Sequence, residues 1–413
     1  SCAFAHRKIY RSMRVLEDYV GMVGSVQEGS GVIYRAFEGN QENFLWNPKY
    51  KSENSDLTKY EPRSGDVLLS RGSANTSAAI ARITNEDSNF SHMGIVYIDP
   101  KTKKIETIEA HIEKGSLVTD ISAYKDMKSR ALVFRFHDPS LTDQQNAQIA
   151  HEAATQIRKV VLKYHNSYKL SIYPPNICYD FSMTVDNPKE FDFSQKNCLF
   201  CSEVVSLGFS LVGDGKYKIP TFLSDINPKN RSFIESLGVK AKKTFAPADI
   251  EIDPYFDLVL EWRDYNRVHA SHRLDSILTV IYSWMDDYDY QFYKTDSVSL
   301  KSKFGYIVRR IPILNSLLGV KDKFPLNMSK NAIETIQMLD IVSNILNNYL
   351  IDQENQAGNY LTPKQMITLL NHWREQDLAE YSTSEPDKVY GKEEDTFRAY
   401  RFHQFFRAKE ETH

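Results

Sequence analysis

A chain of 413 residues is too long for one ordinary hydrophobic core, and its formal net charge of -3 lacks the basic excess of nucleic-acid-binding proteins. Hydrophobic residues make up 41% and charged residues 25%, which is typical of a globular protein rather than a disordered one. No apolar run of about 18 residues is present, so no membrane-spanning helix is expected. We expect more than one domain and no nucleic-acid partner.

The first 60 residues are predicted to form a helix followed by an arm. Residues 1–25 favour a helix that ends at Gly21 and Gly24. Its apolar residues recur at helical spacing: Ile9, Met13, Leu16, Tyr19 and Val20. Residues 26–60 are polar and rich in turns, so they are interpreted as a surface arm.

Cys2 suggests a hypothesis about location. A bacterial lipoprotein begins with a lipidated cysteine, which would attach this chain to the membrane of the cell envelope. The alternative is that Cys2 is an incidental thiol and the protein is cytoplasmic or secreted.

Residues 61–262 are predicted to form an α+β domain. Five short runs indicate neighbouring strands of a small antiparallel sheet, at residues 66–70, 93–98, 104–110, 116–121 and 131–136. Thr142 and Gln145 form a capping box that opens a helix. A second helix is expected from Cys201 to Leu211, and residues 244–260 close the domain.

Residues 263–413 are predicted to be mainly helical. Candidate helices cover residues 272–284 and 330–351, and another begins at Thr362. His269 and His272 have a spacing that suits a metal, but we interpret them as a surface cluster. The apolar residues 311–318 are interpreted as core, with a membrane-facing element as the alternative. The whole region is a candidate docking module for a protein partner.

Cys201 is the first candidate for chemistry, because it begins an amphipathic helix. The positive end of a helix favours the thiolate, which is the nucleophilic form of cysteine. Cys198 is the competing candidate. The Cys198–Cys201 motif has no second pair of metal ligands, so a structural zinc site is not expected.

His92 opens a strand that looks buried, and such a position holds an imidazole rigidly enough to act as a general base. Thr107, Glu109 and His111 share one face of the next strand. An acceptor there would orient the ring of His92, as the third member of a catalytic triad does. Glu109 is the first choice for this role and His111 the second.

Five motifs in a fixed order carry a resemblance to a known family. They are Gly65-Asp66-Val67-Leu68, Ser91-His92-Met93-Gly94-Ile95-Val96, Ile108-Glu109-Ala110, Tyr179-Asp180 and Phe200-Cys201-Ser202-Glu203. Over residues 60–262 the chain resembles the permuted papain-like amidases of the YaeF/YiiX group. These are relatives of NlpC-type cell-wall peptidases and of lecithin:retinol acyltransferase-like enzymes.

The resemblance implies a circularly permuted papain-like domain in which the histidine strand precedes the cysteine helix. It implies Cys201 as nucleophile, His92 as base and Glu109 as orienting residue, with no metal and no cofactor. The implied substrate-binding residues are Ser91, His111, Tyr179 and Asp180. Cys198 departs from the pattern, and its thiol is either buried or paired with Cys178.

These observations predict a cysteine hydrolase that cleaves a peptide or a cell-wall-derived amide through an acyl-enzyme. One alternative is a lipid thioesterase or acyltransferase with the same triad, acting on an acylated small molecule. The other is a catalytically silent binding protein whose helical C-terminal region docks a partner.

Overall fold

One seven-stranded antiparallel sheet organises the molecule, in the strand order β1-β9-β6-β2-β3-β4-β5. The computed structural model describes residues 2–26, 44–51, 59–124, 128–167, 177–185, 198–293, 327–383 and 401–409. The strands are β1 (Phe44–Trp46), β2 (Val67–Gly72), β3 (His92–Ile98), β4 (Ile105–His111), β5 (Gly115–Asp120), β6 (Lys128–Phe136) and β9 (Phe256–Arg263). The α+β class and the five predicted strands are confirmed.

The sheet is larger than predicted because two more segments join it. Strand β1, from the expected arm, pairs with β9, and β9 begins within residues 244–260, the segment that was expected to close the domain. The permuted papain-like topology and the three domain boundaries stay predictions.

Period-two alternation gives the two faces of the sheet different partners. One face packs on α4 (Asp143–Ser167) and α5 (Cys201–Ser210), with Met93 and Ile95 in a shared core with Ile157 and Val204. The opposite face carries a smaller apolar cluster that includes Val96, together with the side chains discussed below. The strand β3 therefore lies between a large core and a second face that carries His92.

The expected helix starts are confirmed at three places. The backbone N–H of Gln145 donates to the hydroxyl of Thr142 at 3.3 Å, while the Thr142 N–H donates to the Gln145 side chain at 2.9 Å. The Thr362–Gln365 pair makes the same bonds, and Ser329 caps its helix through the N–H of Ala332. These short-range signals fix where the long helices begin.

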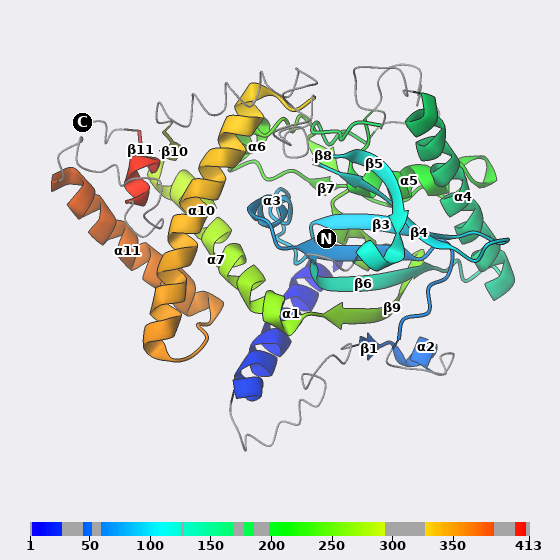
Figure 1. Cartoon of the computed structure of the whole chain (residues 1–413), viewed down its shortest axis with the longest axis horizontal. Helices are drawn as coiled ribbons and strands as arrows, with labels where there is room; N and C mark the ends of the chain where they lie inside the picture. The colour runs from blue at the N-terminus through cyan, green and yellow to red at the C-terminus, as the bar shows by residue number, and fades with distance from the viewer. Residues whose placement is uncertain are drawn as a thin grey trace.

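A second core is built by the C-terminal helices α7 (Tyr265–Tyr288), α10 (Lys330–Ala357) and α11 (Pro363–Thr383) around the buried Trp284. They lie at the left of Figure 1, with the sheet between them and α4. The remaining elements are α2 (Pro48–Lys51), α3 (Asn75–Ile80), α6 (Arg231–Ser236), β7 (Ser224–Asp225), β8 (Lys243–Thr244), β10 (Tyr290–Phe292), β11 (Phe406–Ala408) and 3-10 turns at Ile121–Ala123, Gly213–Gly215, Pro247–Ile252 and Phe402–Gln404. Because α3 packs on both α7 and α10, the second core reaches the sheet domain.

Helix α1 (Cys2–Val26) forms as expected, but its apolar stripe faces solvent. Leu16 is 63% exposed, whereas Asp18 is fully buried. Ile9, Met13 and Val20 are exposed as well. An apolar stripe ordinarily faces the core, so the helix is inverted relative to the usual pattern.

Charged residues on the buried side of α1 explain its orientation. Asp18 accepts hydrogen bonds from Arg130, from Arg263 at 3.0 Å and from His272 at 2.9 Å. These partners lie on β6, β9 and α7, so one carboxylate joins four elements. Orienting α1 the other way would take Asp18 away from the buried Arg130 and Arg263 and leave them to share the carboxylate of Glu261, which costs more than exposing a few apolar side chains.

The interpretation of His269 and His272 as a surface cluster is wrong, because both side chains are buried. His269 binds Glu354 at 2.6 Å, while His272 binds Asp18. The two rings therefore serve different carboxylates, and neither joins a three-ligand metal cluster in the described part of the chain.

Some predictions lie outside the described residues, including the apolar segment 311–318 and the side chain of Cys2. None of the helices that could be searched is both long and apolar enough to span a bilayer.

The inverted orientation of α1 makes two neighbouring substitutions behave differently. Asp18→Asn should lower the free energy of unfolding by about 3 kcal/mol, because it removes the charge that buried arginines need. Leu16→Ser should change it by less than about 0.5 kcal/mol, because the leucine is exposed. Urea denaturation followed by circular dichroism measures both. Equal losses would show that the apolar stripe is the packed side.

Acid should destabilise the protein through Asp18 and Asp275. Burial raises the pKa of each carboxyl, but neighbouring arginines outweigh burial and lower it from 3.8 to about 2. A lowered pKa stabilises the fold above pH 4, and this contribution, about 2 kcal/mol for each group, disappears as the pH falls towards 2. Urea titrations at pH 6, 4 and 2.5 test this, and Asp18→Asn should flatten the decline.

Candidate functional site

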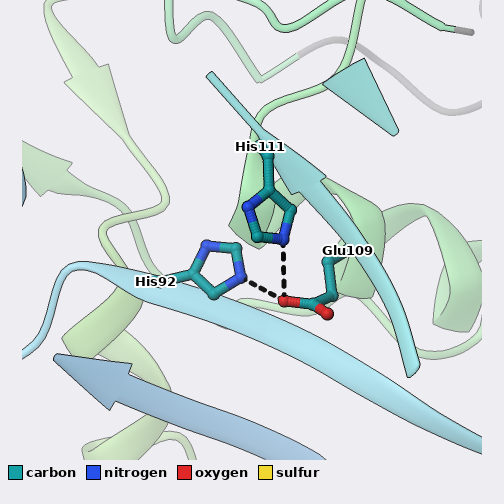
Figure 2. Close-up of side chains that lie close together, drawn as sticks. All are labelled: His92, Glu109 and His111. Atoms are coloured by element: carbon teal, nitrogen blue, oxygen red, sulfur yellow. Dashed lines mark hydrogen bonds and ion pairs between the residues drawn. The ribbon is translucent and has the colours of Figure 1, made fainter. Parts of the chain in front are cut away.

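Two adjacent strands bring three of the predicted residues together at the end of the sheet. His92 Nε2 lies 2.6 Å from Oε2 of Glu109, and His111 Nε2 lies 3.1 Å from the same oxygen. Figure 2 shows both rings directed at this carboxylate. The sequence named Glu109 as first choice and His111 as second choice for orienting His92. In the structure the rings of His92 and His111 both bind the carboxylate of Glu109. The direct partner of the His92 ring is therefore Glu109, the first choice.

Strand register explains why these side chains meet. Gly94 pairs with Glu109, so extending the antiparallel ladder places His92 opposite His111. A Cβ at Gly94 would lie 3.0 Å from Cγ of Glu109 and 3.3 Å from the backbone oxygen of Ile108. The missing side chain therefore leaves the space through which the Glu109 carboxylate reaches His92.

Glu109 is fixed as a carboxylate. Burial raises its pKa, but hydrogen bonds from His111 and His92 outweigh burial and hold that pKa well below its usual value. Its other oxygen, Oε1, accepts hydrogen bonds from the hydroxyls of Thr107 at 3.0 Å and Thr119 at 3.2 Å. An ionised carboxylate has no proton to donate, so each histidine donates its Nε2–H to Oε2.

His92 is held in its neutral form. Burial and the charge of Lys128 lower its pKa to about 4, despite the hydrogen bond to Glu109. With the proton on Nε2, the lone pair of a neutral imidazole is on Nδ1. No hydrogen bond to Nδ1 is found among the described residues, so this nitrogen is available to accept a proton.

Cys201 begins α5 as predicted, and its side chain is buried. Its Sγ lies 4.0 Å from the backbone oxygen of Ser91, and the thiolate form would receive a hydrogen bond from the backbone N–H of Met93. The thiol therefore touches the chain on both sides of His92. No hydrogen bond or ion pair joins Sγ to the ring itself within the described part of the chain.

The expected thiolate is not the resting form of Cys201. Burial raises the pKa of the thiol more than the Met93 N–H, the Ser202 hydroxyl and Lys128 lower it. The helix start was predicted to favour the thiolate, but a side chain 3% exposed loses more hydration than the helix end returns. The raised pKa of the Cys201 thiol and the lowered pKa of the His92 imidazole keep both groups neutral near pH 7.

The disulfide between Cys178 and Cys198 answers the question that the sequence left open. Cys198 has no free thiol in this disulfide, so the competing assignment of Cys198 as nucleophile is wrong in this structure. Cys201 is the free cysteine among those whose side chains the structure describes. The backbone N–H of Leu199 donates to the oxygen of Cys178 at 2.9 Å, and the disulfide lies three residues before Cys201 in the sequence.

The remaining predicted residues have mixed placements. Tyr179 is buried, and the nearby Cys201 adds to burial in raising the pKa of its phenol. Ser91 contributes its backbone oxygen beside the thiol. Asp180 accepts hydrogen bonds from the N–H and hydroxyl of Ser182, both at 2.8 Å, so it holds a turn.

Several residues around the site escaped the sequence analysis. Tyr124 lies with its ring centroid 6.2 Å from that of His92, and its hydroxyl donates to the backbone oxygen of Leu68. Lys128 lowers the pKa of His92, and the hydroxyl of Thr119 donates a hydrogen bond to Glu109. Gly94 alone carried a signal, because a glycine inside a strand often marks a close approach.

Two apolar cavities adjoin the site. A narrow one of about 40 Å³ is lined by Tyr179, Phe181, Ile112 and α3, and by Ile336 and Leu339 of α10. A larger one of about 300 Å³ lies on the same sheet face as Glu109, with Tyr124 and Trp262 in its wall. The narrow cavity therefore brings the C-terminal helix α10 close to Tyr179, which lies near Cys201.

Comparisons with known proteins give a weak structural likeness. No family model matches the sequence, and no curated protein matches it. A crystal structure described as metalloprotein yiiX from Escherichia coli O157:H7 aligns with 48% of this chain and 97% of its own, at 18% identity and a TM-score of 0.33. This relates the chain only loosely to YiiX-like proteins, and it establishes neither a papain-like fold nor an activity.

Gly94→Ala should break the contact between His92 and Glu109. The added methyl displaces the carboxylate, which should remove the downfield NMR signal of the His92 Nε2 proton and cost about 1–3 kcal/mol of stability. His92→Gln identifies the signal by its absence. Gly72→Ala is the matched control, because its methyl meets the hydroxyl of Ser77, which can rotate away. An unchanged signal in Gly94→Ala would contradict the role of Gly94.

Proposed function

We propose that this protein is a cysteine hydrolase that cleaves an amide of a peptide or cell-wall fragment through an acyl-enzyme. One observation carries the proposal: a buried thiol contacts the backbone on both sides of a histidine whose ring is oriented by a buried carboxylate. Nucleophile, base and orienting group are the three parts that such chemistry needs.

In the proposed mechanism the thiol loses its proton during the attack, because the resting pair is neutral. Nδ1 of His92 takes the proton as Sγ of Cys201 adds to the carbonyl carbon, and Glu109 stabilises the imidazolium. The imidazolium then protonates the leaving amine, which leaves a thioester on Cys201. A water molecule, deprotonated by His92, hydrolyses the thioester and restores the thiol.

The start of α5 supports the same chemistry. A helix leaves its first backbone N–H groups without partners inside the helix, and they point towards its positive end. In the proposal, the N–H of Cys201 stabilises the negative oxygen that forms when Sγ adds to the carbonyl, an effect typically larger than any other single catalytic contribution.

A lipid thioesterase or acyltransferase is the second candidate, and the apolar cavities favour it. The narrow cavity is lined in part by Tyr179, which lies near Cys201. Aliphatic side chains from α3 and α10 surround it, which suits an acyl chain or an apolar side chain of the substrate. In either reaction the C-terminal helices would help to select the substrate.

The disulfide supports a location outside the reducing cytosol. Disulfides form and persist in secreted proteins and in the bacterial periplasm. The bond between Cys178 and Cys198 therefore agrees with the proposed cell envelope or secreted location, while lipid attachment at Cys2 stays a proposal.

Alkylation and hydrolysis test the function. Iodoacetamide should modify Cys201 with an apparent pKa above the usual value of about 8.5, because burial raises it. Hydrolysis of a panel of peptide amides and acyl esters should disappear in Cys201→Ser and fall at least about 100-fold in His92→Gln. His151→Gln is the matched control, because this histidine lies on α4 and binds Ser64.

The outcomes separate the candidates. Cys201-dependent cleavage of amides supports the hydrolase, and cleavage of acyl esters alone supports the thioesterase. If the wild-type protein hydrolyses no member of the panel, the protein is the silent binding protein instead, and hydrolysis that survives replacement of both Cys201 and His92 would contradict the proposed mechanism.

A further inference from the structure

His92, Glu109 and His111 have a second chemical use besides orienting a base. Their nearest ligand atoms all lie within 4.8 Å of one another, and Figure 2 shows them converging on one point. Two imidazole nitrogens and one carboxylate oxygen are one of the ligand sets found in three-ligand zinc sites, which keep a fourth position for water.

We infer that these three residues bind a divalent transition-metal ion such as Zn²⁺, and that the bound ion switches off the base. The switching part rests on the proposed function, whereas the binding part does not. The proposal concerns His92 Nε2, His111 Nε2 and Glu109 Oε2, which already lie 2.6 and 3.1 Å apart as nitrogen–oxygen pairs.

The surroundings position the carboxylate for this role. The hydroxyls of Thr107 and Thr119 bind Oε1 of Glu109, so Oε2 is the oxygen left facing the two rings. Such outer contacts orient metal ligands and typically contribute tenfold to 100-fold in affinity. The side chain of His111 is 33% exposed, so an ion with its water can enter from that side.

Metal binding and base catalysis exclude each other at His92. In the metal-free site the proton of His92 is on Nε2, and the Nδ1 lone pair is free. When an ion takes Nε2, that proton moves to Nδ1, because a neutral imidazole carries one proton. The ring then has no lone pair with which to accept the proton of Cys201. The same tautomer change occurs at His111, so no proton is gained or lost overall.

Lys128 sets a limit on the affinity and supplies an independent test. Its charge acts on His92 and Glu109, so it repels a cation in this cluster. Removing that charge should tighten binding, while removing a ligand should weaken it. Two substitutions in one site are therefore expected to act in opposite directions.

The binding experiment uses the full chain and Zn²⁺ in competition with a chromophoric chelator. We expect one ion per chain, with affinity at least about tenfold weaker in His111→Gln and tighter in Lys128→Gln. Cys201→Ser and the control His151→Gln should bind as the wild type does. Binding that survives His111→Gln unchanged, or that is lost in Cys201→Ser, would overturn the inference.

The second measurement is Cys201-dependent hydrolysis of 4-nitrophenyl acetate with and without Zn²⁺. We expect Zn²⁺ to abolish it in wild type, a chelator to restore it, and any residual rate of His111→Gln to resist the same concentration. If zinc binds in the cluster and hydrolysis continues, the switch is refuted. If the metal-free protein shows no Cys201-dependent hydrolysis, the proposed function fails, and the binding experiment still decides the metal site.

Discussion

The hydrogen bond between His92 and the buried carboxylate of Glu109 is the constraint on which the rest of the site depends. It needs an ionised carboxylate inside a sheet, which two histidines and two threonine hydroxyls stabilise. It also needs space, which Gly94 provides on the neighbouring strand. Once Glu109 is fixed, the proton of His92 is on Nε2 and its Nδ1 is the atom left for chemistry.

Burial decides how such a site would operate. A helix start and a nearby lysine both favour a cysteine thiolate, yet they do not offset the loss of water around Cys201. The same loss keeps His92 neutral. In the proposed reaction, the neutral Cys201 thiol would transfer its proton to the neutral His92 ring during the attack. A thiolate–imidazolium pair would not be present beforehand. This makes the position of Nδ1 more important than the resting acidity of the thiol.

The helical C-terminal region contributes to the walls of a cavity next to the site. Ile336 and Leu339 of α10 line this cavity together with Tyr179. The buried charges around Asp18 join α1, α7 and two strands. Both sets of contacts are made between segments more than 100 residues apart in sequence. The sheet domain and the helices therefore share their interior with segments that sequence analysis had assigned to separate units.

The sequence by itself determined the local structure: five strands from their short runs, three helix starts from their capping residues, and the neighbours His92, Glu109 and His111 from strand periodicity. These features depend on residues close together in the chain. Only the tertiary structure decided that α1 turns its charged side inward, that Cys178 pairs with Cys198, and that Cys201 is neutral. Each of these follows from desolvation or from a distant partner, and neither is encoded in local spacing.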